Sequence, residues 1–352
     1  MAMRVWERTG GSRRGLARCA AAAVLFGLST PAASRLARHL DGLPLAGFLY
    51  LGAALGVAPF ALARRPTVTA VRASAPRLAI AVVLGGAVGP VLLAFGLRDL
   101  PAATASLLLN LELVFTGVLA YVLFREYLGA WLVAGTALVV GAGAVLGWSG
   151  AAELRTGALL VVAACVCWSV DNTVTAHLET LAPVHITLTK GAIAGSANLA
   201  IGLATGGAMP WRYALLAMVV GAFGYGASIT LWVAGAREIG AARGQLVFAC
   251  APFVGAVAAW TVLGEPVLGR QVLALVVAMT GVALVLQSGH EHTHVHDMHE
   301  HDHEHDHDDG HHEHHERAVM GRHQHAHRHE PVAHDHGHMP DLHHRHEHED
   351  DA

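Results

Sequence analysis

The chain has 352 residues, 53% of them hydrophobic, and a formal net charge of −4 when its histidines are neutral. Residues 1–289 carry nineteen Arg or Lys against ten Asp or Glu, whereas residues 290–352 carry four against seventeen. The first part is too apolar for a soluble domain, and no nucleophile motif or phosphate-binding loop is present, so the sequence favours neither an enzyme nor a nucleic-acid-binding protein.

Ten apolar segments follow one another, and each is close to the roughly 20 residues needed to cross a bilayer. The Arg-rich residues 1–15 and the Ala-rich stretch behind them could also form a signal peptide, but the internal repeat described next requires the first segment. We therefore predict an all-α membrane protein with ten transmembrane helices, at residues 16–35, 43–62, 77–97, 101–123, 128–148, 156–177, 185–205, 211–234, 242–263 and 268–287.

The chain also repeats itself at a fixed offset of 139 residues. This offset aligns Arg98 with Arg237 and Glu126 with Glu265 without a gap. Each half contains five predicted spans, and because five is odd, the second half enters the membrane from the opposite side. Secondary transporters use this arrangement to build alternating access around a site at the midplane. The sequence thus predicts two inverted five-helix repeats, at residues 16–148 and 149–287.

Charge predicts the orientation in the membrane. With the N-terminus inside, the short inner segments hold twelve arginines and the outer loops hold six, which the positive-inside rule favours. An even number of spans then places residues 288–352 in the cytosol as well. Since Ala, Gly, Leu and Arg dominate as they do in GC-rich bacterial genomes, we expect a multi-pass protein of the bacterial inner membrane.

Some matched features of the two repeats predict structural roles. The GxxxG pairs at residues 52–56 and 191–195 place small residues one turn apart, which favours close helix packing. Glu126 and Glu265 close their spans at equivalent positions, where capping or loop anchoring is the expected role.

Ionisable residues within the spans predict the functional site, because each one costs at least about 2.5 kcal/mol at mid-bilayer unless it is paired or hydrated. Glu112 lies midway along the fourth span, Asp171 lies in the sixth, and Lys190 is the only lysine of the chain. Either carboxylate could bind a proton or a cation, Lys190 could be a structural counter-ion, or all three could be solvated near span ends. Cys167 and Asp171 share a helix face and could touch one cation. The candidate cavity and coupling residues are Glu112, Asn110, Asp171, Asn172, Lys190 and Cys167.

Residues 288–352 predict a disordered cytoplasmic tail that binds metal. They hold twenty-four of the twenty-seven histidines and almost no large apolar residues, so they cannot form a packed core. Alternating imidazole and carboxylate groups bind Ni²⁺, Co²⁺ or Zn²⁺ with little geometric selection, and we expect weak, exchanging sites with no required cofactor. The densest ligands are His299, His301, His303, His305, His307, His311, His312, His314 and His315.

Two segments resemble the signatures of a known family. Residues 97–115 read LRDLPAATASLLLNLELVF, and Leu263-Gly264-Glu265 closes the ninth span. These features are similar to those of EamA-type members of the drug/metabolite transporter superfamily. The resemblance implies ten helices in two inverted repeats around a central cavity, and export of small solutes that is often presumed to be driven by protons.

The chain departs from that family pattern at two cavity positions and in its tail. Leu113 stands where the family often has Pro, and Leu51 stands where an Arg is common, although Lys190 holds the equivalent place in the second repeat. The histidine tail resembles the appendage of nickel- and cobalt-resistance efflux members of the superfamily.

Three functional hypotheses follow. The first is proton-driven export of a divalent transition metal, nickel or cobalt before zinc, with the tail collecting cytosolic metal. The second is export of a small organic solute, with the tail acting as a metal buffer or regulator. The third is a membrane protein that stores or senses metal without transporting it. The expected partners are the lipid bilayer, the transported solute and protons, and a homodimer stays open.

Overall fold

The computed structural model describes residues 10–63, 66–124, 130–147, 152–176, 178, 181–239, 244, 247–287, 290–296, 300–305, 323–328 and 332–338. The chain divides into two compact units. One contains residues 1–288 and 342–352, and the other contains residues 289–341.

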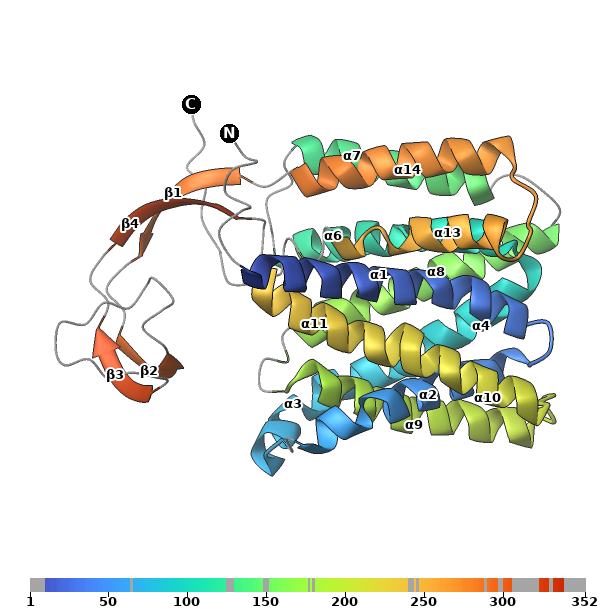
Figure 1. Cartoon of the computed structure of the whole chain (residues 1–352), viewed down its shortest axis with the longest axis horizontal. Helices are drawn as coiled ribbons and strands as arrows, with labels where there is room; N and C mark the ends of the chain where they lie inside the picture. The colour runs from blue at the N-terminus through green and yellow to red at the C-terminus, as the bar shows by residue number, and fades with distance from the viewer. Residues whose placement is uncertain are drawn as a thin grey trace. The chain divides into compact units, whose positions relative to one another are not determined.

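The first unit is a bundle of helices, and its described residues contain no strand (Figure 1). The helices of the first half are α1 (Gly10–Leu36), α2 (Gly42–Ala63), α3 (Val68–Ile80), the π-helix η2 (Ala81–Val88), α4 (Gly89–Asp99), α5 (Ala102–Leu108), α6 (Leu111–Phe124) and α7 (Ala130–Gly147). Those of the second half are α8 (Ala152–Ala176), α9 (Pro183–Ala204), α10 (Trp211–Val220), the π-helix η3 (Gly221–Ala227), α11 (Ser228–Ile239), α13 (Ala251–Thr261) and α14 (Gly269–Gln287).

The repeat found in the sequence has structural counterparts. The offset of 139 residues carries η2 onto residues 220–227, which is where η3 lies. Two spans are also interrupted at nearly matching places, because turns at Leu109-Asn110 and at Ala249-Cys250 precede α6 and α13. π-helical segments and broken transmembrane helices both tend to occur at functional sites.

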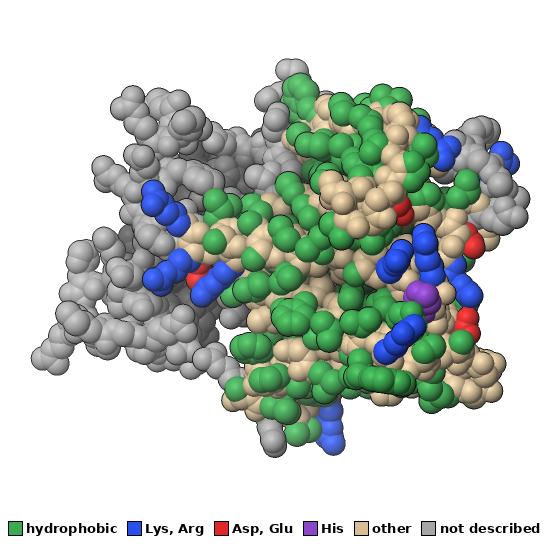
Figure 2. Space-filling view, turned by 45° about the vertical axis from the view of Figure 1, so that its right-hand side comes forward, with side chains coloured by type: hydrophobic (Ala, Val, Ile, Leu, Met, Phe, Trp, Pro, Cys, Tyr) green, Lys and Arg blue, Asp and Glu red, His purple; other side chains and the backbone are tan. Residues whose placement is uncertain are grey.

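The described helices include six that are long and apolar enough to cross a membrane, among them the 32-residue series Val68–Asp99. Three shorter apolar helices accompany them, at Val133–Leu146, Ala251–Thr261 and Gly269–Leu284. The count of ten spans therefore stays a prediction, since interrupted spans leave short pieces such as the 11-residue α13. Figure 2 shows hydrophobic side chains covering the middle of one face and basic side chains near both ends, as a bilayer requires.

The GxxxG glycines lie where helices approach each other closely. A side chain at Gly52 would meet the backbone of Met218, and one at Gly191 would meet the backbone of Tyr50. Gly52 thus lies where α2 packs against α10, and Gly191 lies where α9 packs against α2. The predicted packing role of these glycines is confirmed.

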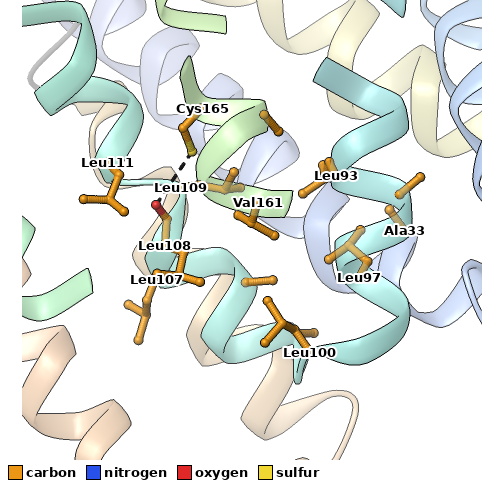
Figure 3. Close-up of a cluster of buried hydrophobic side chains, with 14 of the residues drawn as sticks. Ala33, Leu93, Leu97, Leu100, Leu107, Leu108, Leu109, Leu111, Val161 and Cys165 are labelled. Carbon is orange, nitrogen blue, oxygen red and sulfur yellow. Dashed lines mark hydrogen bonds between the residues drawn. The ribbon is translucent and has the colours of Figure 1, made fainter. Parts of the chain in front are cut away.

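A cluster of buried apolar side chains joins the two halves beside the interrupted fourth span (Figure 3). Leu97, Leu108 and Val161 are each at most 3% exposed. Cys165 is fully buried in this cluster, and its Sγ lies 3.8 Å from the carbonyl oxygen of Leu108. The cluster holds α8 against α4 and α5, which positions Asp171 and Asn172 nearly two turns further along α8.

Glu265 links the end of one repeat to the start of α5 in the other. Its Oε1 accepts a hydrogen bond from the backbone N–H of Ala102 at 2.7 Å, and its Oε2 accepts one from Ala103 at 3.0 Å. The carboxylate therefore caps a helix N-terminus, where negative charge is favoured. The anchoring role predicted for Glu265 is confirmed, whereas Glu126 lies outside the described residues.

In the second unit, the structure differs from the disordered tail that the composition predicts. Strand β1 (His290–His296) pairs antiparallel with β4 (Val332–His338), and β2 (Glu300–His305) pairs antiparallel with β3 (His323–Arg328). The alternation of histidine with other residues has the two-residue period of a strand, and main-chain pairing needs no apolar side chains. Of the predicted metal ligands, His301, His303 and His305 lie in β2. The other six, His299, His307, His311, His312, His314 and His315, lie outside the described residues.

Candidate functional site

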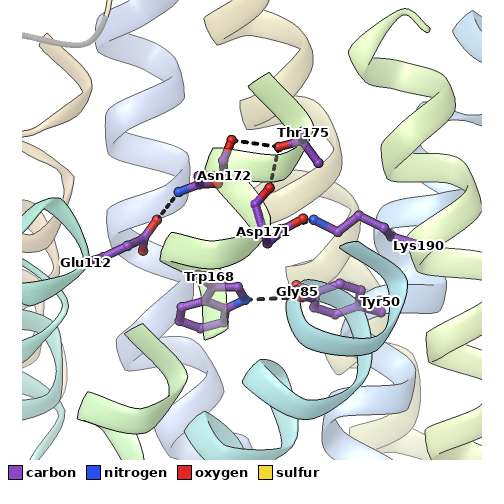
Figure 4. A network of polar contacts seen from close by, with 8 residues as sticks. All are labelled: Tyr50, Gly85, Glu112, Trp168, Asp171, Asn172, Thr175 and Lys190. Atoms are coloured by element: carbon purple, nitrogen blue, oxygen red, sulfur yellow. Dashed lines mark hydrogen bonds and ion pairs between the residues drawn. The ribbon is translucent and has the colours of Figure 1, made fainter. Parts of the chain in front are cut away.

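Three ionisable side chains, one buried and two partly buried, come together in one polar network (Figure 4). Glu112 comes from α6, Asp171 and Asn172 come from α8, and Lys190 comes from α9. The network therefore joins the interrupted fourth span of the first repeat to two helices of the second.

Glu112 lies in the first turn of α6, directly after the break in its span. The side-chain amide of Asn172 donates a hydrogen bond to its Oε1 at 2.7 Å. The hydroxyl of Ser169 donates to the backbone carbonyl of Glu112 at 3.0 Å. The start of a helix favours a nearby negative charge, so the hydrogen bond and the helix offset part of the cost of placing a carboxylate in the bundle.

Asp171 forms an ion pair with Lys190. The sequence had left open whether Lys190 pairs with a carboxylate. The Asp171 residue is only 3% exposed, and its Oδ1 has no hydrogen-bond partner among the described residues. The side chain of Lys190 is 16% exposed, so it lies closer to the solvent-accessible side of the network. Taking both charges out of water is costly, which makes the pair weak evidence for stability and stronger evidence for function.

The π-helix η2 contributes a backbone acceptor that the sequence analysis missed. The carbonyl oxygen of Gly85 accepts hydrogen bonds from the hydroxyl of Tyr50 at 2.6 Å and from Nε1 of Trp168 at 3.1 Å. The ring of Tyr225, in η3, lies 5.8 Å from that of Tyr50 between centroids. Buried aromatic rings thus line one side of the ion pair.

Gly85 also makes room for the Asp171 carboxylate, because a Cβ at this position would overlap it. We expect Gly85→Ala to lower the free energy of unfolding by about 1–3 kcal/mol, as overpacking does in other interiors. Thermal unfolding of the purified protein in detergent would measure the change. Gly117→Ala is the matched control, since no atom lies within 4 Å of its added methyl group. Equal melting temperatures for the two variants would contradict this close approach.

Two predicted site residues lie apart from the network. The amide of Asn110 donates to the carbonyl oxygen of Leu107 at 3.0 Å, within the turn that separates α5 from α6. Cys167 is half-buried, and Asp171 faces Lys190 instead, so the shared Cys167–Asp171 cation site stays a prediction. Among the described residues, no three His, Cys, Asp or Glu side chains form a group that could hold a metal ion.

These features define a class of protein. Two related halves, interrupted helices and a set of two carboxylates and one ammonium group within the bundle, of which Asp171 is buried, are the features of a membrane transporter, since charges of this kind mark pathways for ions or solutes.

Comparison with known proteins identifies the family. The model of the EamA-like transporter family matches residues 13–148 and again residues 155–287, so the chain belongs to this family. The two matches agree with the two repeats, and transporters of this family are generally not enzymes.

Individual relatives add the following. An uncharacterized transporter of Methanothermobacter thermautotrophicus is 31% identical over 221 residues, which are 60% of this chain and 64% of that protein. A solved protein crystal structure with 18% sequence identity superposes with a TM-score of 0.54, over 79% of this chain and 96% of the other. At this identity the second likeness concerns the fold alone.

Proposed function

We propose that this transporter exports a divalent transition-metal cation, nickel or cobalt before zinc, in exchange for protons. The observation that carries the proposal is the closeness of two carboxylates. Glu112 accepts a hydrogen bond from Asn172, and the adjacent residue of α8, Asp171, holds the second carboxylate. Carboxyl groups in an apolar interior can bind a cation or take up a proton, and such exchange is the chemistry that coupled export needs.

Glu112 is the proposed coupling carboxylate. It has no counterpart in the second repeat, where Ala251 takes its place, and it follows the break in its span. Its hydrogen-bond donor Asn172 is exposed, so the carboxylate lies one polar residue from the surface of the bundle. Export would then proceed with proton entry at Glu112 in each cycle.

The tail is the proposed collector of metal. Its twenty-four histidines carry the ligands that the bundle lacks among its described residues, and its seventeen carboxylates attract cations. Placed in the cytosol with the N-terminus, at the inner membrane of a bacterium, it would raise the metal concentration at the inner mouth. The excess of arginines on the proposed inner segments supports this orientation.

Removal of the tail tests the collector role. If the tail only concentrates metal, truncation after Ser288 should raise KM for Ni²⁺ several-fold and leave the maximal rate nearly unchanged. Uptake of Ni²⁺ into inside-out vesicles, measured over a range of concentrations, separates the two constants. The loss of transport at saturating metal would contradict a collector, because a tail without a direct role in the transport step cannot limit the rate there.

Export of a small organic solute is the second candidate, and a specific observation favours it. Tyr50, Trp168 and Tyr225 are buried around the ion pair, and aromatic surfaces suit an organic molecule better than a bare metal ion. In that case Ni²⁺ would not enter the vesicles. Added Ni²⁺ would instead bind to the tail and thereby change the rate at which the organic solute is transported. A protein that binds Ni²⁺ through the tail and moves neither kind of solute would be a store or sensor of metal.

A further inference from the structure

The ion pair at the centre of the network is incomplete. Oδ2 of Asp171 faces the ammonium group of Lys190, whereas Oδ1 of Asp171 is buried without a hydrogen-bond partner among the described residues. A buried carboxylate oxygen without a donor costs free energy, and native proteins retain such groups where a ligand or an ion completes them. Asp171 therefore has unused capacity for a second positively charged group.

The two partners differ in how freely they can move. The side chain of Asp171 is 4% exposed and that of Lys190 is 16% exposed. The carboxylate of Asp171 is also held in place by η2, because it packs directly against Gly85, where the missing side chain leaves room for it. Lysine carries its charge on a flexible four-carbon stem, so the ammonium group can withdraw from a carboxylate that stays in place.

Among the described residues, Asp171 is the only carboxylate that forms an ion pair with Lys190. Of the described elements packed against α9, α2 contributes Tyr50, η2 contributes no titratable side chain, and α11 contributes Glu238, which is already paired with Arg18. His185, on α9 itself, is bound to the carbonyl oxygen of Ala61 at 3.1 Å. Glu112 is close enough for its charge to interact with that of Lys190, but it accepts its hydrogen bond from Asn172 and forms no ion pair with Lys190.

We propose that Asp171 is the binding site for the positive charge of the transported solute, and that Lys190 occupies this site whenever the solute is absent. The choice of a cation as solute rests on the proposed function. An empty carrier must change conformation without an unpaired charge in the apolar interior, and Lys190 supplies the neutralising charge for that step. An arriving cation takes the carboxylate, and the ammonium group withdraws toward the exposed side of the network.

A tethered competitor has a specific kinetic signature. Lys190→Met removes the competitor, so KM for the cation should fall about tenfold, while the maximal rate falls because the empty carrier then returns with an unpaired carboxylate. Lys190→Arg should raise KM, since a guanidinium group binds a carboxylate through two parallel hydrogen bonds. Asp171→Asn should abolish transport.

The double variant Asp171→Asn with Lys190→Met separates this role from a merely structural one. It removes both charges and should restore thermal stability, but transport should stay absent because the binding site is gone. If Lys190 were only a structural counter-ion, the double variant would restore transport together with stability, and Lys190→Met would not lower KM. Either of these results would overturn the proposal.

The measurement uses the full-length protein in proteoliposomes, with Ni²⁺ as the probe in one arm and ethanolamine, a small organic ammonium ion, in the other. A lower KM in Lys190→Met for only one probe identifies that source of positive charge and supports the proposal. A wild-type protein that moves neither probe would defeat the proposed function and this inference together. Wild-type transport with an unchanged KM in Lys190→Met defeats the inference alone.

Discussion

Glu112→Gln is expected to eliminate proton-driven export while the protein still inserts into the membrane. Glutamine keeps the size of the side chain and an oxygen that can accept from Asn172, so the contact at 2.7 Å has a replacement. It removes the ability to bind and release a proton, and a carrier without that ability cannot couple export to a pH gradient. In inside-out vesicles with an imposed pH gradient, Glu112→Gln should no longer accumulate metal against its concentration gradient, and only flux down that gradient should remain.

The pH dependence of the residual flux provides the second readout. Wild-type export should change between about pH 6 and pH 8 as the coupling carboxyl group takes up protons, whereas the flux of Glu112→Gln should be nearly constant over this range. Asn172→Ala is the matched control, because it removes the hydrogen bond and leaves the carboxylate in place. Its export should survive with a shifted pH profile. Wild-type behaviour of Glu112→Gln at every pH would assign the coupling to another group, with Asp171 as the next candidate.

The tail should bind several metal ions per chain at neutral pH and release them in acid. Each imidazole binds metal only in its neutral form, and imidazole takes up a proton as the pH falls through about 6.5. A site with two histidine ligands should therefore lose roughly 100-fold in affinity between pH 7.5 and pH 5.5. Calorimetric titration of a peptide covering residues 288–352 with Ni²⁺ measures both the stoichiometry and the affinity.

A peptide in which asparagine replaces all twenty-four histidines of residues 288–352 is the control for binding by carboxylates. It keeps all acidic residues of the tail, so any binding that it retains should show little dependence on pH in this range. Fewer than one ion bound per wild-type peptide, or equal affinity at the two pH values, would rule out histidine ligands. A gain of β-structure on adding Ni²⁺ would connect binding to the paired strands β1–β4 and β2–β3.

The sequence determined the features that are written along the chain. Apolar runs predict where helices cross the membrane because lipid accepts only segments that are apolar over their whole length. The fixed offset of 139 residues predicted matching halves, and the matched π-helices and the double family match agree with it. The rarity of buried charge singled out Glu112, Asp171 and Lys190. The tail differs from this pattern. Its composition predicted disorder, but histidine alternates with other residues at the two-residue period of a strand, and part of the tail forms paired strands.

Only the tertiary structure decided which of these groups meet. The contact between Glu112 and Asn172 joins residues 60 positions apart, and the bonds from Tyr50 and Trp168 to Gly85 span 35 and 83 positions. Hydrophobicity cannot predict such contacts, because in lipid every face of an apolar helix is equally compatible with its surroundings. Which faces meet is decided by close packing at small residues such as Gly52, Gly85 and Gly191, where an added methyl group would overlap a neighbour. The pairing of Lys190 with Asp171 and not with Glu112 follows from that packing.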